Sequence, residues 1–149
     1  VGTGMGVADD APALDMAYKL TGYAGKGRLK LSPGKRTLPG RKQVFRQEDD
    51  EGRLVRDVIG RADEILPGRP LLRKVMEGGL RLPAGGDPLE ALRHRTRREL
   101  ERLPEGIRAL EAADPPWTVI VSDELRSYTE NVTRAVAERT TGQEDEEDT

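Results

Sequence analysis

Hydrophobic and more polar residues alternate in two short segments near the start of the chain. Positions 14, 16, 18 and 20 are hydrophobic, and residues 28–31 repeat the alternation. A period of two is typical of a strand with one buried face. Gly25-Lys26-Gly27 lies between the two segments and suits a turn, so the pattern predicts an antiparallel pair of strands.

Further strands are expected where hydrophobic residues recur in short segments. Residues 43–46 form one such segment, and residues 54–59 and 71–76 form two more after an acidic turn at 48–52. Pro67-Gly68 separates the last two segments and is typical of a turn. The first half of the chain is therefore predicted to consist mainly of short strands.

The second half changes to a helical pattern. Asp87 is a favourable N-cap, Pro88 suits the first helical position, and Glu90 can complete a capping box. The predicted helix carries one apolar stripe with a period near 3.6 residues and ends at Pro104. The stripe consists of Leu89, Leu92, Leu100 and Leu103.

A strand and a second helix are predicted near the end of the chain. Residues Trp117–Val121 are rich in β-branched side chains, which favour a buried strand. Ser122 is expected to cap the helix that follows, with Asp123 and Glu124 in its first turn, where acidic groups complement the helix dipole. From Gly142 onward the chain is an acidic tail, which we expect to be disordered.

The composition excludes several classes of function. The 149 residues include 25 Lys and Arg against 27 Asp and Glu, which argues against a general nucleic-acid binder. The sequence has no cysteine, so it offers neither disulfides nor thiolate chemistry and fits a reducing compartment. No apolar run approaches the roughly 20 residues that cross a bilayer, and we see no secretion signal. We therefore expect no membrane contact and place the protein in the cytoplasm.

Glycines near the first residue provide a candidate phosphate site. A phosphate is held by several converging backbone N–H groups, and glycine allows close approach because it has no Cβ. Gly2-Thr3-Gly4 can supply such donors, with the Thr3 hydroxyl as an additional one. Closely spaced glycines are also typical of an ordinary turn, so both interpretations stand on the residues alone.

A basic segment at residues 26–46 is the second candidate. Its cations can bind pyrophosphate, ATP or nucleic acid, or they can form the solvated face of a sheet whose other face carries Leu29 and Leu31. Both interpretations of these cations, a binding site and a solvated sheet face, stand on the residues alone. The cations are Lys26, Arg28, Lys30, Lys35, Arg36, Arg41, Lys42 and Arg46.

Other residues with chemical potential favour structural interpretations. The single histidine, His94, lies off the leucine stripe among arginines, so we expect it on a wet helical face without a catalytic role. Asp9, Asp10 and Asp15 resemble magnesium ligands but more often cap turns. Trp117 is expected to be a packing anchor. We assign no catalytic and no metal-binding residue to this chain.

Several motifs together resemble nicotinate phosphoribosyltransferases. The chain opens with Val1-Gly2-Thr3, similar to the Gly-Val-Gly-Thr phosphate loop of that family, and Tyr18-Lys19-Leu20 stands where the family has a strand. The segments Lys30–Lys35 and Thr37–Arg46 resemble the family's Lys-Leu-Ser and Pro-Gly segments. The similarity continues to about Arg139. It indicates a C-terminal fragment that lacks the upstream two thirds of the enzyme.

The resemblance implies an α+β fragment. We expect the end of an irregular α/β barrel of the type II phosphoribosyltransferases, antiparallel strands of the smaller sheet domain, and two C-terminal helices. The expected divisions are a phosphate loop at 1–13, an antiparallel-strand region at 14–86, a helix-strand-helix region at 87–141 and the acidic tail at 142–149.

The resemblance also implies an activity. The parent enzyme forms nicotinate mononucleotide and pyrophosphate from nicotinate and phosphoribosyl pyrophosphate in NAD salvage, uses ATP and Mg²⁺, and is expected to be a homodimer. By this resemblance Gly2 and Thr3 hold the phosphate of phosphoribosyl pyrophosphate, while the phosphorylated histidine belongs to the missing part, so the fragment alone is expected to be inactive. Two alternatives stay open, a non-catalytic partner-binding module and a weak nucleic-acid-binding module.

Overall fold

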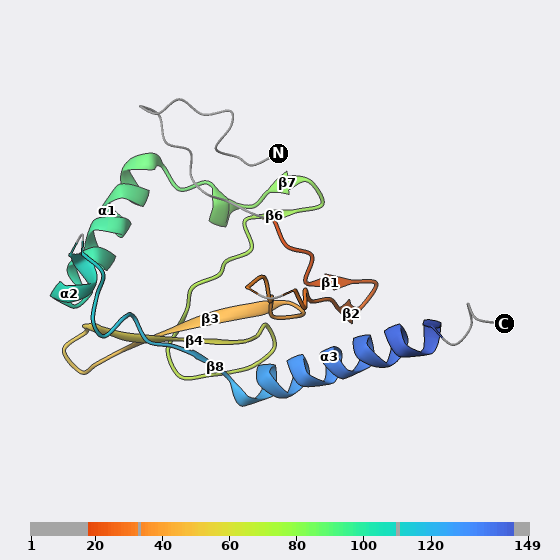
Figure 1. The fold of residues 1–149 in the computed structure, drawn as a ribbon. Helices are drawn as coiled ribbons and strands as arrows, with labels where there is room; N and C mark the ends of the chain where they lie inside the picture. Colours follow the sequence, from red (N-terminus) through yellow and green to blue (C-terminus); the bar gives the residue numbers. More distant parts are fainter. Residues whose placement is uncertain (1–17, 33, 110, 145–149) are drawn as a thin grey trace, which may run out of the picture.

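The computed structural model describes residues 18–32, 34–109 and 111–144, which form a mixed α and β structure. The expected α+β class is therefore confirmed. A four-stranded sheet with the order β5-β3-β4-β8 occupies the centre, α3 lies along one side of it, and a segment that carries α1 and two short strands stands apart from it (Figure 1).

Two long strands form the middle of the sheet. β3 (Lys42–Glu48) and β4 (Leu54–Arg61) pair antiparallel, with Phe45 opposite Val58. Phe45 and Leu54 are buried, at 6% and 1% exposure. The Asp49 carboxylate accepts hydrogen bonds from the Glu51 and Arg53 amides and so fixes the turn between the strands. Both strands were predicted from the sequence, and both are confirmed with slightly longer bounds.

The outer strands are short. β5 (Arg69–Pro70) pairs antiparallel with β3, whereas β8 (Val119–Val121) pairs parallel with β4. The Ser122 hydroxyl accepts a hydrogen bond from the Leu125 amide (3.1 Å), which confirms Ser122 as the cap of α3 (Asp123–Glu144). Leu125 is fully buried where α3 contacts β4. α3 runs past 141, the boundary expected for the tail, and residues 145–149 lie outside the described residues.

The strand pair expected at 14–20 and 28–31 is wrong over its described residues. Instead β1 (Gly22–Tyr23) and β2 (Lys26–Gly27) form a small hairpin whose turn residues Ala24 and Gly25 have φ of 48° and 73°. Residues 28–31 form no strand, and the Arg28 amide donates to the Thr21 carbonyl next to the Gly22–Gly27 pair. The alternation of residue types does not correspond to a half-buried strand over the described residues, and the observed turn at Ala24 and Gly25 comes earlier than Gly25-Lys26-Gly27 suggests.

After β5 the chain leaves the sheet. The strand predicted at 71–76 is wrong, since only β6 (Met76–Glu77) and β7 (Leu80–Arg81) pair, as a separate hairpin. A 3₁₀ turn, η2 (Pro83–Gly85), leads to α1 (Leu89–Glu101), and α2 (Glu105–Arg108) follows. Both helices of this segment carry no buried residue.

The start of α1 differs in detail from the prediction. Pro88 occupies the cap position, and the Asp87 carboxylate accepts hydrogen bonds from Arg73 and Arg95 instead of capping the helix. The leucine stripe is not buried, since Leu89 and Leu100 are 67% and 50% exposed. The periodicity predicted the helix correctly, but it did not predict what the helix packs against. Over the described residues, no helix has the length and hydropathy of a membrane-crossing segment.

Candidate functional site

Two of the sequence candidates lie outside the described residues. Gly2 and Thr3, assigned to phosphate binding, belong to the segment 1–17, as do Asp9, Asp10 and Asp15. The phosphate loop therefore stays a prediction. The described part of the basic segment, in contrast, borders a cavity.

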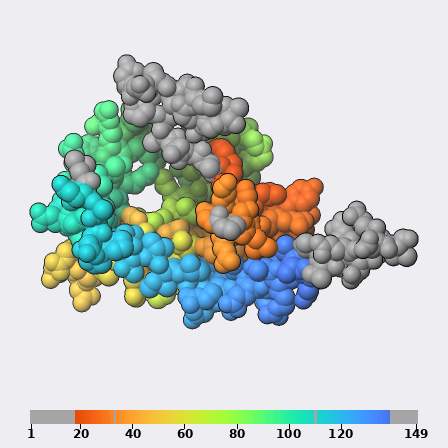
Figure 2. Space-filling view, in the orientation of Figure 1, coloured from red at the N-terminus to blue at the C-terminus, as the bar shows by residue number. Residues whose placement is uncertain are grey.

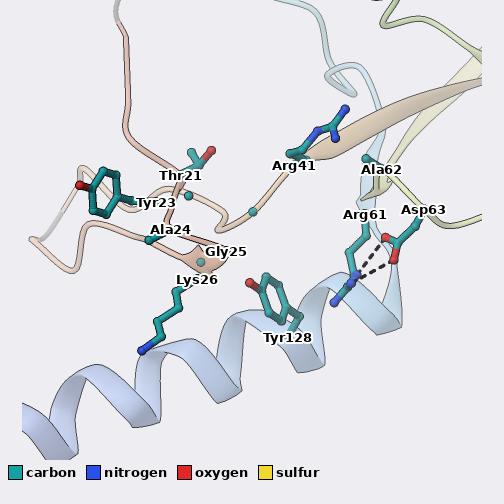
Figure 3. Close-up of a pocket in the computed structure, with 13 residues that line it drawn as sticks. Thr21, Tyr23, Ala24, Gly25, Lys26, Arg41, Arg61, Ala62, Asp63 and Tyr128 are labelled. Carbon is teal, nitrogen blue, oxygen red and sulfur yellow. Dashed lines mark hydrogen bonds and ion pairs between the residues drawn. The ribbon is translucent and has the colours of Figure 1, made fainter.

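The cavity of about 660 Å³ lies between the β1–β2 hairpin and α3 (Figure 3). Residues 40–41 and 61–63, which lie at the same end of the β3–β4 pair, where β3 begins and β4 ends, close its remaining sides. Its volume falls in the range typical of small-molecule sites. The lining residues are Thr21, Gly22, Tyr23, Ala24, Gly25, Lys26, Gly27, Gly40, Arg41, Arg61, Ala62, Asp63 and Tyr128.

Tyr128 of α3 lines one wall of this cavity, and its side chain lies so close to residues 27 and 40 that both must be glycine. A Cβ at Gly27 would lie 2.5 Å from the Tyr128 hydroxyl, and a Cβ at Gly40 would lie 3.0 Å from the ring. Gly40 also has φ of 74°, a conformation that favours glycine. Its amide donates to the Thr21 carbonyl (2.5 Å), which ties the hairpin to the sheet. The glycines at 27 and 40 thus allow α3 to approach the hairpin closely.

The cations of the cavity differ in their partners. Arg61 lies over the Tyr128 ring (4.8 Å) and pairs with Asp63 (3.1 Å) and Glu124 (3.5 Å). Its hydrogen bonds to Asp63 raise the pKa of Arg61 and lower that of Asp63. Lys26 and Arg41 have no acidic partner in the described part of the chain, and Figure 3 shows their side chains extending in different directions. The described wall can therefore attract anions, but it does not bring these two cations onto one small ion.

Lys42 has a structural role. Its Nζ donates to the carbonyls of Leu38 (2.8 Å) and Gly40 (2.6 Å), on either side of the buried Pro39. Partial burial lowers the pKa of Lys42. The Lys42 side chain therefore stabilises the turn before β3. Lys35, by contrast, is exposed.

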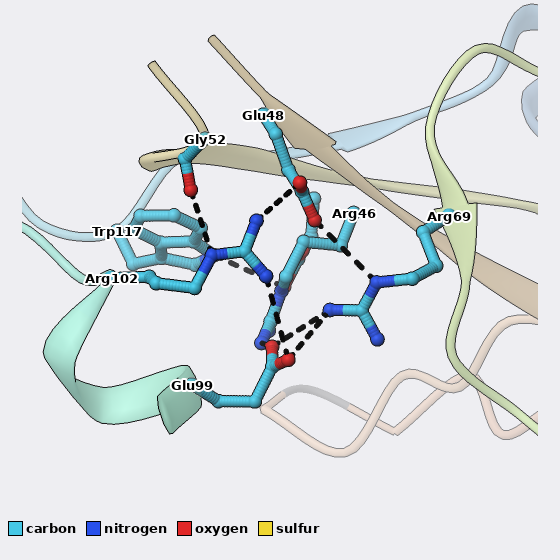
Figure 4. Close-up of polar contacts among 8 residues, drawn as sticks. Arg46, Glu48, Gly52, Arg69, Glu99, Arg102 and Trp117 are labelled. Atoms are coloured by element: carbon cyan, nitrogen blue, oxygen red, sulfur yellow. Dashed lines mark hydrogen bonds and ion pairs between the residues drawn. The ribbon is translucent and has the colours of Figure 1, made fainter. Parts of the chain in front are cut away.

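Arg46, the last cation of the basic segment, belongs to a polar network nearer the other end of the β3–β4 pair (Figure 4). Its Nε and Nη2 donate to the two oxygens of Asp57, both at 2.8 Å, and its guanidinium lies 5.9 Å from the Trp117 ring centre. The Trp117 Nε1 also donates to Asp57 (3.1 Å). Asp57 is only 7% exposed, and the Arg46 hydrogen bond lowers its pKa. Trp117 is half-buried and contacts Arg46 and Asp57, while its role as a packing anchor stays a prediction.

Glu99 of α1 connects that network to the segment beyond the sheet. Its carboxylate accepts two hydrogen bonds from Arg69 (2.9 and 2.8 Å) and lies 3.7 Å from both Arg46 and Arg102. Arg102 also pairs with Glu48 and donates to the Gly52 carbonyl (2.7 Å). Each carboxylate of this network is paired with guanidinium groups, and we interpret the network as a structural connection between α1 and the sheet.

His94 lies where the sequence predicted. It is on the exposed side of α1, and its Nε2 is 3.6 Å from Glu90, with the side chain 64% exposed. Among the described residues no group of three histidines or carboxylates could hold a metal ion. Tyr128, Arg61, Asp57 and Glu99 were missed by the sequence analysis, since their partners are distant in the sequence and no local motif marks them.

Comparisons with known proteins identify relatives of one kind. No protein-family model matches the chain. A nicotinate phosphoribosyltransferase of Mycobacterium tuberculosis is 46% identical over 125 residues, which is 84% of this chain and 27% of that protein. The nicotinate phosphoribosyltransferases of cattle and human are 39% and 36% identical over 69 residues, 45% of this chain and 13% of each protein.

A solved structure has the same fold. The crystal structure of human nicotinic acid phosphoribosyltransferase matches with a TM-score of 0.64 at 24% identity, over 78% of this chain and 26% of that chain. The chain spans about a quarter of the length of the mycobacterial relatives it matches. The sequence match and the fold agree, and the chain is therefore a relative of the nicotinate phosphoribosyltransferases, matched over about a quarter of their length.

Proposed function

We propose that the chain is part of an enzyme that forms nicotinate mononucleotide and pyrophosphate from nicotinate and phosphoribosyl pyrophosphate, in NAD salvage. The observation that carries this proposal is the 46% identity over 125 residues to a mycobacterial nicotinate phosphoribosyltransferase. The fold match to the human enzyme is consistent with it. Both matches cover about a quarter of the relative, so the proposal concerns the whole enzyme of which this chain is a part.

Within that enzyme we assign the chain two tasks. Gly2 and Thr3, at the end of a barrel strand, hold the phosphate of phosphoribosyl pyrophosphate through backbone N–H groups and the Thr3 hydroxyl. The β3–β4 sheet and α3 form a smaller domain beside the barrel, in a homodimeric enzyme. The nicotinate pocket and the histidine that is phosphorylated during ATP hydrolysis lie on residues outside this chain.

ATP and Mg²⁺ serve the whole enzyme. The described residues contain no group of three carboxylates or histidines that fits a magnesium ion. Mg²⁺ is usually held by one or two carboxylates together with substrate phosphates. When bound, the ion would neutralise phosphate charge.

The experiment that tests the proposal compares the whole enzyme with a Thr3→Ala variant. Loss of a hydrogen bond to a charged phosphate costs about 1.5–3 kcal/mol, so the KM for phosphoribosyl pyrophosphate should rise about tenfold to a hundredfold while the KM for nicotinate changes little. The 149-residue chain alone should form no nicotinate mononucleotide. An unchanged KM would remove Thr3 from the site, and activity of the isolated chain would refute the division of tasks.

A non-catalytic partner-binding role is the second candidate, and the exposed segment around α1 favours it. A nucleic-acid-binding role has less support, because Lys42 and Arg46 of the basic segment are engaged inside the protein. Binding to a phosphate backbone weakens steeply with salt. A filter-binding titration at two salt concentrations therefore separates the two roles.

A further inference from the structure

A continuous segment of the chain has regular structure although none of its residues is more than partly buried. Residues 71–109, here called the arm, include β6, β7, η2, α1 and α2, and none of them is buried. The central sheet and α3, in contrast, bury Phe45, Leu54 and Leu125. Fixing each residue costs about 1–2 kcal/mol of conformational entropy, which a segment without buried side chains does not offset by itself.

The arm also carries large hydrophobic side chains on its surface, on the hairpin and on α1. Isolated exposed hydrophobic residues are ordinary, whereas these recur along one segment that has no fully buried residue. The exposed fractions are 55% for Leu72, 44% for Val75, 57% for Met76, 73% for Leu80, 67% for Leu89 and 50% for Leu100.

Polar contacts attach the arm to the sheet. Glu99 pairs with Arg69 (2.8 Å) and approaches Arg46 (3.7 Å), and the Leu54 amide donates to the Arg102 carbonyl (2.9 Å). A groove of about 530 Å³ lies between α1 and the sheet, and Figure 2 shows an opening between these parts of the molecule. Partly exposed ion pairs contribute little stability, so they orient the arm more than they hold it.

The charge of the arm indicates what kind of surface would cover it. The arm has nine Lys and Arg against six Asp and Glu, although the whole chain has a net charge of −2. On α1, the side chains of Arg93, Arg97 and Arg98 have no acidic partner within the described residues. A complementary surface would therefore be apolar at its centre and acidic at its rim.

We propose that the arm is the docking surface for the remainder of the phosphoribosyltransferase polypeptide, through an apolar surface with an acidic rim. The inference rests on the proposed function. The length of the relatives supports this occupant, because the chain matches only 27% of the mycobacterial enzyme and 26% of the human one. A polypeptide of that length provides ample surface to bury the arm. The hairpin and α1 are the parts that contact it.

The test mixes the 149-residue chain with the segment of the mycobacterial relative that the chain does not match, produced as a soluble protein. Sedimentation or calorimetry measures the dissociation constant. The double variant Met76→Asp/Leu80→Asp should weaken binding about tenfold or more, because two apolar side chains lose their burial. Ile65→Asp is the matched control, since Ile65 is 98% exposed but lies outside the arm, and it should leave the constant unchanged.

A second variant keeps every apolar side chain. Arg93→Glu/Arg97→Glu should weaken binding about tenfold at low ionic strength and less at high salt, because salt screens rim charges. All substituted residues are exposed, so circular dichroism spectra should stay those of the wild type.

Several results would overturn the inference. One is that the wild-type chain does not bind the folded segment. Another is that the arm variants and the Ile65 variant weaken binding equally. A third is that the chain self-associates and only the arm variants abolish this self-association, which would identify a second copy as the occupant. Nicotinate mononucleotide formation by the mixture is measured separately. If the mixture binds through the arm but forms no nicotinate mononucleotide, the docking surface is supported and the proposed function is refuted.

Discussion

The molecule contains two contrasting regions. The central sheet and α3 bury apolar side chains, whereas the arm leaves several of them exposed. In the sheet, Phe45, Leu54 and Leu125 are withdrawn from water and Asp57 is satisfied by three hydrogen bonds. The arm has regular hairpin and helix geometry, yet Leu80, Leu89 and Leu100 are exposed and ion pairs connect it to the sheet. Local sequence signals suffice to form a helix such as α1, whereas the place of that helix is determined by what it packs against.

The largest effect is expected from removing a buried leucine of the sheet region. Leu125→Ala should lower the free energy of unfolding by about 2–5 kcal/mol, because it removes buried methyl groups and leaves a cavity. Leu100→Ala in the arm should cost less than about 1 kcal/mol, since Leu100 is 50% exposed. Urea denaturation of both variants measures the difference. Equal losses would mean that the arm shares the core.

A second, smaller effect concerns the Asp57 carboxylate. Asp57→Asn should cost about 2 kcal/mol at neutral pH, since it removes a charged acceptor from Arg46 and Trp117. Because hydrogen bonding from Arg46 lowers the pKa of Asp57, this stability is present above the unfolded pKa near 3.9 and is lost as the pH falls through the folded pKa.

Thermal melts between about pH 7 and 2 test this sign. The wild type should lose more stability than the Asp57→Asn variant as the pH falls. Asp50→Asn, at an exposed position in the same β3–β4 turn, is the control and should follow the wild type. Parallel curves for wild type and Asp57→Asn would contradict the assignment.

The β1–β2 turn offers a stabilising substitution. Ala24 has φ of 48°, a left-handed conformation that costs a residue with a Cβ about 1 kcal/mol. Ala24→Gly should therefore raise the free energy of unfolding by up to about 1 kcal/mol. Ala62→Gly, at a position without positive φ, should lower it instead. A drop in stability for Ala24→Gly would show that the turn is unstrained.

The smallest effect on global stability is expected for the contacts of the arm. Glu99→Gln weakens its pairs with Arg69, Arg46 and Arg102, and it should change the free energy of unfolding by less than about 1 kcal/mol. Amide exchange within α1 should nevertheless accelerate. Glu90→Gln on the same helix should leave that exchange unchanged, because Glu90 contacts no residue of the sheet among its described partners.

The sequence predicted the parts that depend on local patterns. β3, β4, α1 and α3 were expected near their observed bounds, and the Ser122 cap was identified from residue type alone. The strand at 71–76 failed because a strand needs a partner, and the chain leaves the sheet after β5. The parallel pairing of β8 with β4 and the bond between Trp117 and Asp57 join residues about sixty positions apart, so no local pattern marks them.

The candidate site was predictable only in part. Lys26 and Arg41 were among the basic residues singled out from the sequence, and both line the cavity. Tyr128 and Arg61 complete it from elements far along the chain, and the roles of Lys42 and Arg46 inside the protein depend on contacts that composition does not reveal. The predicted phosphate loop at Gly2 and Thr3 awaits the KM measurement described above.

Amide hydrogen exchange of the 149-residue chain, alone and with the complementary segment of the mycobacterial relative, tests the contrast between the two regions most directly. Alone, β3, β4 and the start of α3 should exchange slowly, whereas residues 71–109 should exchange rapidly because they bury no side chain. Addition of the segment should slow exchange in β6, β7 and α1. Slow exchange throughout the arm of the isolated chain, or no change on mixing, would contradict this account.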